Sequence, residues 1–142
     1  MMYIILGCND IVSVLAQNLS KSGAKIFIVA SDETTLIRLK ESYIHTLVAN
    51  IHTLDLASLP TKDTLAFILL QNNFKDNLIL VKRIKNSFPD KFILSIATNE
   101  KEASELLESG ADRIVQTVGI ITHNILNELE TAKLKRSVFH LV

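Results

Sequence analysis

Short apolar runs alternate along the chain with longer segments in which apolar residues recur every three or four positions. Short runs rich in β-branched residues are typical of strands buried on both faces, and the longer pattern is typical of helices with one buried side. The alternation therefore predicts βαβ units that form a parallel sheet. The expected strands are Tyr3 to Leu6, Lys25 to Val29, His45 to Ala49, Thr64 to Leu69, Phe92 to Ile96 and Asp112 to Gln116.

Helix start and stop signals fill most of the intervals between these strands. Gly23 and Gly110 stand where glycine commonly follows the last helical turn. Asn99 is a favourable N-cap, and Pro89 stops the helix that precedes it. We therefore expect an α/β fold with a Rossmann-like, doubly wound parallel sheet of six strands. The expected helices are Ile11 to Ser22, Asp32 to Glu41, Lys75 to Phe88 and Asn99 to Ser109, and Thr53 to Leu59 has room for only one or two turns.

The last segment differs, because one apolar face continues there for about four helical turns. This pattern predicts two parts, a sheet domain at residues 1–117 and a C-terminal helix and tail at residues 118–142. The helix would either pack on its own sheet, serve dimerisation or link to a following segment. Its expected apolar face is Val118, Ile121, Ile125, Leu129 and Ala132.

Composition excludes several classes of function. The chain has 142 residues, enough for about one domain, and its 15 basic and 15 acidic residues give a formal net charge of zero. No field of one sign favours nucleic acid or an anionic membrane. No apolar run reaches the roughly 18 residues of a membrane-spanning helix, and the N-terminus lacks the basic region of a signal peptide. We expect a cytoplasmic domain without direct membrane insertion.

Candidate chemistry outside the first turn is sparse. Cys8 is the single cysteine, which excludes an internal disulfide, and the four histidines lack the spacing of a zinc site. The carboxylates of the segment from Glu100 to Glu108 form a solvated helix face, with a divalent cation at a subunit seam as the alternative. No Walker A, G-x-S-x-G or Ser/His/Asp signature is present. We expect no metal and no catalytic residue, and hence no enzyme.

The turn after the first strand keeps part of a dinucleotide-binding fingerprint. Gly7 occupies the first glycine position of G-x-G-x-x-G, whereas Asn9 and Val12 stand at the other two. We expect Gly7 to make the tight turn and Asn9, which tolerates positive φ, to direct its side chain into the phosphate volume. Asp10 would cap the following helix and place a negative charge where a phosphate binds.

Two further segments complete a family resemblance. The Gln71-Asn72-Asn73 loop leads to Asp76-Asn77-Leu78, and the run from Glu105 to Val115 reads E-L-L-E-S-G-A-D-R-I-V. With the glycine turn they resemble the RCK domain, also called KTN or TrkA-N, over about residues 2 to 130. The resemblance implies a Rossmann fold, a dimer or an octameric ring, and regulation of an attached potassium channel or transporter by a nucleotide or cation.

The chain departs from the family pattern at positions that would face a nucleotide. The acidic residue that usually follows the second strand aligns with Ala30, the Gly-Asp pair after the third strand aligns with Ala49-Asn50, and an arginine after the fifth strand aligns with Ile96. We therefore expect no conventional cofactor, with a weakly bound adenine nucleotide as the alternative. The residues expected to line this degenerate site are Gly7, Asn9, Asp10, Ser31, Asp32 and Asn50.

Two functions follow from different classes. The first is a cytosolic regulatory and assembly module, a homodimer or higher ring at the inner face of the cell membrane through a pore or transporter partner. The second is a stand-alone Rossmann-type nucleotide sensor or enzyme with an atypical site. An excess of apolar side chains supports assembly through the later helices. The side chains expected at this interface are Leu78, Ile79, Ile84, Leu106, Ile121, Ile125 and Leu129.

Overall fold

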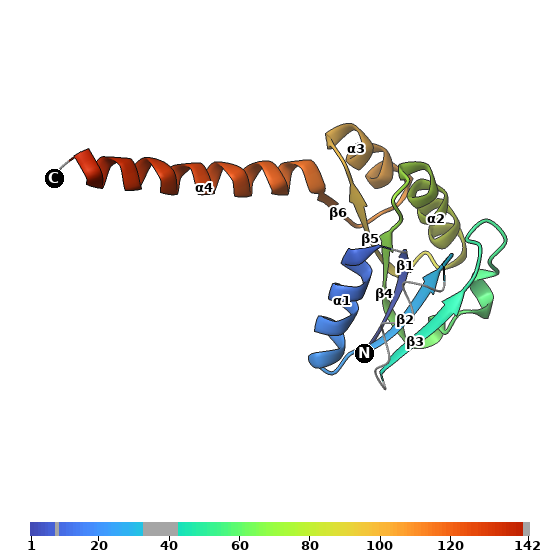
Figure 1. Cartoon of the computed structure of the whole chain (residues 1–142). Coiled ribbons are helices and arrows are strands. Elements are labelled where there is room, and N and C mark those ends of the chain that lie inside the picture. The colour runs from blue at the N-terminus through green and yellow to red at the C-terminus, as the bar shows by residue number, and fades with distance from the viewer. Residues whose placement is uncertain (8, 33–42, 141–142) are drawn as a thin grey trace.

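The structure, a computed structural model, describes residues 1–7, 9–32 and 43–140. Six parallel strands form one sheet in the order β3-β2-β1-β4-β5-β6, which confirms the predicted Rossmann-like α/β fold (Figure 1). The strands are β1 (Met2–Gly7), β2 (Lys25–Ala30), β3 (Ile44–Val48), β4 (Thr64–Leu70), β5 (Phe92–Ala97) and β6 (Arg113–Gln116). Most strand ends differ from the predicted ones by one residue, and the other ends coincide with the prediction.

Helices lie on both faces of the sheet, α1 on one face and α2 with α3 on the other (Figure 1). Two short 3₁₀ turns, η1 and η2, replace a crossover helix between β3 and β4. The predicted helix from Asp32 to Glu41 falls almost wholly on residues 33–42, outside the described residues. The elements are α1 (Asp10–Lys21), η1 (Leu56–Ser58), η2 (Thr61–Asp63), α2 (Phe74–Ser87), α3 (Glu100–Ser109) and α4 (Thr117–His140).

Asparagine begins each helix that packs on the sheet. The side chains of the three N-caps accept hydrogen bonds from backbone N–H groups of the first turn, which otherwise lack a partner. The caps are Asn9 for α1, Asn73 for α2 and Asn99 for α3. The predicted Asn99 cap is confirmed. The prediction that Asp10 caps α1 is wrong, because Asp10 is the first helical residue and Asn9 is the cap.

The two faces of the sheet form separate apolar clusters. Beneath α2 and α3, Phe67 and Leu69 of β4 pack in one cluster with Ile84 and Leu106. Beneath α1, the other faces of β1 and β2 pack with Val12 and Ala16. Ile84 and Leu106 are fully buried in this core. Their predicted place at a dimer interface is therefore wrong, since each already packs within its own chain.

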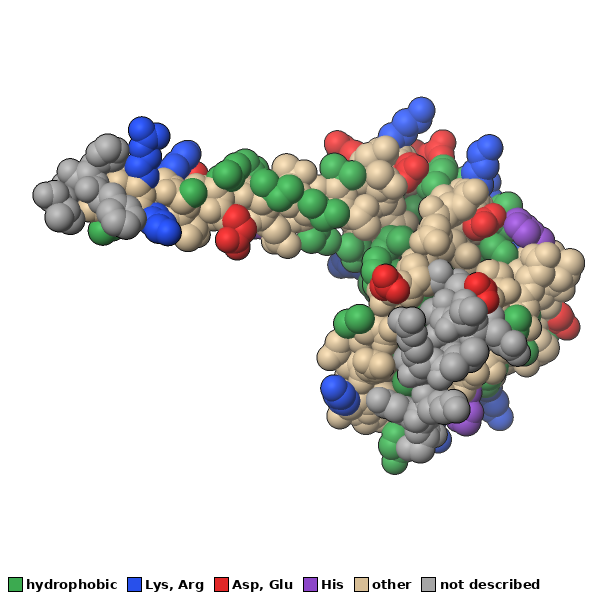
Figure 2. Space-filling model, in the orientation of Figure 1, with side chains coloured by type: hydrophobic (Ala, Val, Ile, Leu, Met, Phe, Trp, Pro, Cys, Tyr) green, Lys and Arg blue, Asp and Glu red, His purple; other side chains and the backbone are tan. Residues whose placement is uncertain are grey.

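Helix α4 is longer than predicted and leads straight away from the sheet (Figure 1). Every residue from Val118 to Val138 is exposed. Figure 2 shows hydrophobic side chains along the part of α4 nearest the sheet and Lys and Arg side chains towards its far end. Eight large apolar side chains in this range are at least half exposed, namely Val118, Ile120, Ile121, Ile125, Leu126, Leu129, Leu134 and Val138. Within the described part of the chain, no helix is both long and apolar enough to cross a bilayer.

Candidate functional site

The carboxyl ends of β1 and β4 lie side by side, and here the order of the strands reverses. In open α/β sheets ligands bind at this switch point, so it is the first place to look for a site. All six predicted site residues lie at this edge of the sheet or in the segments that leave it. Gly7, Asn9 and Asp10 link β1 to α1, Ser31 and Asp32 follow β2, and Asn50 follows β3.

Gly7 is required for the packing of two strands. A Cβ atom at this position would lie 2.7 Å from the carbonyl oxygen of Leu70, the residue that pairs with Gly7 in β4. The backbone of Gly7 does not adopt positive φ, so glycine is not needed here for its conformational freedom. Gly7 instead permits the close approach of β1 and β4 at the switch point.

The side chain of Asn9 bridges the two strands at this point. Its Nδ2 atom donates to the carbonyl oxygen of Leu70 at 2.8 Å and to Oδ1 of Asn72 at 3.0 Å, while its Oδ1 atom accepts from the amide of Val12 at 3.2 Å. Its backbone has φ of −151°, so the expected positive φ is wrong. The amide therefore fills the gap between β1 and the loop after β4 with protein hydrogen bonds.

The other residues predicted to face a ribose or a phosphate at this edge are poorly suited to bind either group. Asp10 is exposed in the first turn of α1, where its charge opposes the binding of an anion near the helix N-terminus. Ala30 is buried at the end of β2, and the following Ser31 and Asp32 are exposed. Because Ala30 has no acceptor, a ribose would lack the usual hydrogen-bond partner at the end of β2.

Asn50 is engaged in the turn that leaves β3. Its Oδ1 atom accepts from the amide of His52 at 2.9 Å, and its carbonyl oxygen accepts from the amides of Thr53 and Leu54. This arrangement is an Asx-type turn, in which the side chain replaces a backbone acceptor. The predicted site residue Asn50 thus stabilises its own loop.

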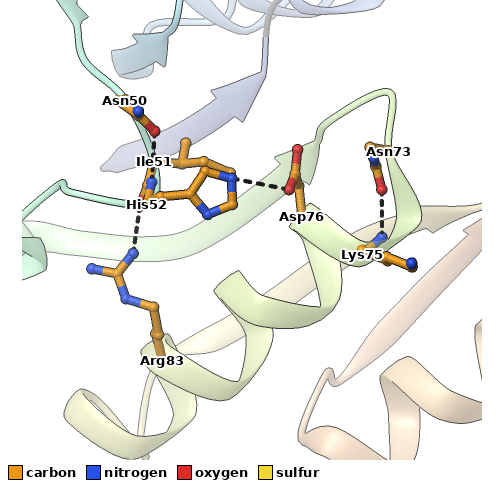
Figure 3. Close-up of polar contacts among 7 residues, drawn as sticks. All are labelled: Asn50, Ile51, His52, Asn73, Lys75, Asp76 and Arg83. Carbon is orange, nitrogen blue, oxygen red and sulfur yellow. Dashed lines mark hydrogen bonds and ion pairs between the residues drawn. The ribbon is translucent and has the colours of Figure 1, made fainter.

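Helix α2 holds the same loop from the other side (Figure 3). Arg83 donates to the carbonyl oxygen of Ile51 at 2.5 Å and also to that of Leu54. His52 Nε2 lies 3.3 Å from Asp76 Oδ1 in the first turn of α2. With Ile51 and Leu54 both buried in the core, these contacts fix the loop beside the switch point.

A small cavity lies on the other side of the switch point, between the ends of β1, β4 and β5. Its volume is about 190 Å³, below the roughly 300–1,000 Å³ that is typical of ligand pockets. Among the described residues that line it, Glu102 is the single charged group, and its Oε1 atom accepts from the amide of Thr98 at 2.9 Å. Ile96 adds an apolar wall where the family pattern has an arginine. The cavity therefore lacks a cation for a phosphate.

Asn9 lines this cavity, but most of its other lining residues were not among the predicted site residues. They include Gln71 and Asn72 after β4 and Thr98 after β5. The signal was present in the strand order, because the ends of β4 and β5 flank the switch point as closely as the end of β2 does. In residues 1–7, 9–32 and 43–140, no three His, Cys, Asp or Glu side chains are grouped to hold a metal.

The chain matches the family model of the TrkA-N domain over residues 3–117. Among solved structures, the TrkA-N domain of inner membrane protein ybaL from Escherichia coli superimposes with a TM-score of 0.78 at 19% identity, covering 90% of this chain and 96% of that chain. The Shewanella denitrificans Kef CTD in AMP bound form gives 0.80 at 16% identity, covering 93% and 81%. No curated protein sequence matches the chain.

A third solved structure, the GsuK channel bound to NAD, gives a TM-score of 0.76 at 18% identity. This chain is covered over 95% of its length but corresponds to only 25% of the channel chain. The likeness to these three proteins shows a common fold. The AMP and the NAD belong to the structures of those two proteins.

Proposed function

The chain belongs to the TrkA-N, or RCK, domain family, and we propose that it is a cytosolic regulatory and assembly module of a potassium channel or transporter. In this proposal the module reaches the inner face of the membrane through its pore or transporter partner. In this proposal residues 1–117 are the sheet domain, and residues 118–142 are a C-terminal helix and tail that serve assembly. The observation that supports assembly most directly is the exposed apolar surface of α4.

No loop separates α4 from β6, so α4 lacks the flexible connection that it would need to fold back on its own sheet. It begins at Thr117, directly after the last residue of β6. The amide of Val118 donates to the carbonyl oxygen of Thr98 at 3.2 Å. The hydroxyl of Thr117 donates to the carbonyl oxygen of Ala97 at 3.4 Å. These contacts fix the start of α4 to the end of β5. Apolar residues left in water along such a helix favour a second subunit.

The sheet domain offers a second apolar surface that matches α4 in character. A groove of about 350 Å³ lies over β4 and β5, on the sheet face that also carries α1. A two-fold dimer would bring the α4 helix of each copy to such a surface on its partner, since homo-oligomers of this kind use the same patch on both subunits. The residues that line the groove are Tyr3, Leu65, Ala66, Ile68, Phe92 and Leu94.

Charge substitutions on α4 test this assembly. In Ile121→Asp with Ile125→Asp, two carboxylates enter the proposed seam at a cost of several kcal/mol, so we expect a monomer with an intact sheet domain. The control, Asn124→Asp with Asn127→Asp, adds the same charge to the polar face and should remain dimeric. Size exclusion with light scattering gives the mass. A monomeric parent chain at high micromolar concentration would refute the assembly.

The same module is proposed to lack a conventional nucleotide site. The amide of Asn9 fills the switch point, Ala30 provides no ribose acceptor, and the neighbouring cavity has a carboxylate where a phosphate would need a cation. We expect titration calorimetry to give no dissociation constant in the low micromolar range, about −8 kcal/mol, for NAD(H), ATP or ADP. A weaker adenosine-type ligand is compatible with this geometry.

Restoring the family residues gives the positive experiment. Asn9→Gly with Ala30→Asp frees the gap and supplies the ribose acceptor, and Val12→Gly completes the glycine pattern. Val12 is fully buried, so Val12→Gly opens a cavity that destabilises the fold by about 2–3 kcal/mol. The double variant keeps Val12 and therefore avoids this loss of stability. Measurable affinity for an adenine nucleotide is the expected gain over the single Asn9→Gly variant. Folded variants that ignore every adenine nucleotide would show that other features abolished the site.

A nucleotide-sensing module is the alternative, favoured by the AMP and NAD present in two of the similar structures. Under this alternative, Asn9, Ser31 and Asn50 would hold the nucleotide in an unusual mode. Micromolar binding by the parent chain, reduced by Asn50→Ala and unaffected by the exposed Asn86→Ala, would select it.

A further inference from the structure

We propose that Asn9 acts as an internal tether across the switch point: beyond the paired strands β1 and β4, it holds together the segments that leave the two halves of the sheet, as a bound ligand otherwise would. The inference rests on the proposed loss of conventional nucleotide binding. It concerns a different property, the ligand-independent rigidity of the carboxyl edge. Asn9 belongs to the half formed by β1, β2 and β3, and its two acceptors belong to the half formed by β4, β5 and β6.

The three hydrogen bonds of Asn9 serve two separable purposes. Oδ1 accepts from the amide of Val12 and caps α1 within the first half. Nδ2 donates to Leu70 and Asn72 and so joins this half to the second. A ligand bound at a switch point makes the same kind of connection, because it contacts the loops that follow strands on both sides. The neutral amide makes it without an anion.

The acceptor side of the tether is itself held in place. Asn77, buried in α2, accepts from the amide of Gln71 at 3.1 Å and donates to its carbonyl oxygen at 3.1 Å. These bonds fix the chain direction between Leu70 and Asn72, where the tether attaches. Gly7 allows the strands to approach closely enough for the short side chain of Asn9 to span them. The tether therefore depends on the short amide side chains of Asn9 and Asn77 and on the absence of a side chain at Gly7.

Asn9→Ser separates the tether from the cap. Serine is nearly as good an N-cap as asparagine, so α1 keeps its start, but serine lacks the Nδ2 donor. Hydrogen exchange of the full chain should become about tenfold faster at the backbone amides of residues 70–77, which corresponds to about 1.4 kcal/mol. Exchange in the middle of α1 should stay within about twofold of the wild type. Asn72→Ala removes one of the two acceptors and should give a smaller increase at the same amides.

The matched control is Asn18→Ser, which makes the same substitution in α1. The side chain of Asn18 donates to the carbonyl oxygen of Val14 within α1, away from the switch point, so residues 70–77 should exchange as in the wild type. Equal exchange at residues 70–77 in wild type, Asn9→Ser and Asn72→Ala overturns the tether. If Asn9→Ser does not fold, the exchange of residues 70–77 in Asn72→Ala alone tests the tether. Calorimetric binding of NAD or AMP to the wild type would refute the proposed loss of nucleotide binding, while the exchange data alone judge the tether.

Discussion

The sheet domain and α4 use apolar side chains in opposite ways. In the sheet domain, α2 and α3 each present a buried stripe, and Leu6 of β1 and Phe67 and Leu69 of β4 are fully buried. In α4, the large apolar side chains from Val118 to Val138 are all at least half exposed. The two regions are joined without a loop, so one continuous chain passes from a closed core to an open helix.

This difference teaches that apolar content and apolar burial are separate properties of a segment. The sheet domain is stabilised within one chain, because each helix lies against a strand. The apolar residues of α4 add little to the folding of a single copy and are available for contact with another. Substitutions of equal chemistry should therefore act on folding in the first region and on assembly in the second.

The sharpest form of the comparison is a pair of leucine truncations. Leu106 is fully buried in α3, whereas Leu126 of α4 is 55% exposed. Leu106→Ala should lower the free energy of unfolding by about 3 kcal/mol, because it removes apolar burial and leaves a cavity. Leu126→Ala should lower it by less than about 0.5 kcal/mol. Urea denaturation at a concentration where the chain is monomeric measures both. Equal losses would abolish the distinction between the two regions.

Two glycines provide the second pair. An added methyl group at Gly7 meets the backbone of Leu70, so Gly7→Ala should cost about 2 kcal/mol as strands β1 and β4 are forced apart. Nothing lies within 4 Å of the corresponding position at Gly119 in α4. Gly119→Ala should cause no loss and strengthens the helix by roughly 1 kcal/mol through propensity. Thermal unfolding followed by circular dichroism distinguishes these outcomes, and a neutral Gly7→Ala would contradict the close strand contact.

A third test concerns helix caps. The side chain of Asn99 accepts from the amide of Glu102, and Glu102 in turn accepts from the amide of Thr98. Asn99→Ala should cost about 1 kcal/mol, as is usual for the loss of an N-cap. The exposed Asn124, within α4, has no such task, and Asn124→Ala should be neutral or slightly favourable. Denaturant midpoints give the comparison, and a neutral Asn99→Ala would mean that the cap is dispensable.

The smallest effect is expected from the surface ion pair of α4. Lys133 Nζ lies 3.1 Å from Glu130 Oε1, and both side chains are at least two-thirds exposed. Glu130→Gln should change stability by less than about 0.5 kcal/mol, with the difference vanishing in high salt. A larger change, measured in the same denaturation assay, would show that this part of α4 is buried against another surface.

The sequence predicted the strands, the helix order and the family because these depend on local periodicity and on glycine, proline and asparagine signals. Asn99 and Gly110 were placed correctly, since a cap and a terminal glycine act within one turn. The contacts of Gly7 and of the Asn9 amide with Leu70 were not predicted, because Leu70 lies more than sixty positions away in the chain. Periodicity also identified an apolar face on α4 without revealing that Ile120 and Leu134 lie off it.

The candidate site shows the same limit. Asn50 was predicted to line a ligand site, and the sequence did not predict that its side chain stabilises the turn that follows β3. Ile84 and Leu106 were expected at an interface, yet both belong to the core beneath the sheet. A sequence pattern identifies which residues are apolar or polar, whereas the neighbour that each one meets depends on the strand order.

The direct passage from β6 to α4 also has a mechanical meaning. Helix α4 has 24 residues, so it extends roughly 36 Å from its start. A tilt of about 10° at Thr117 would displace its far end by about 6 Å, given that rise per residue. Its start is bonded to Ala97 and Thr98, which also line the cavity at the end of β5. The helix is thus a lever arm whose fulcrum lies at the carboxyl edge of the sheet.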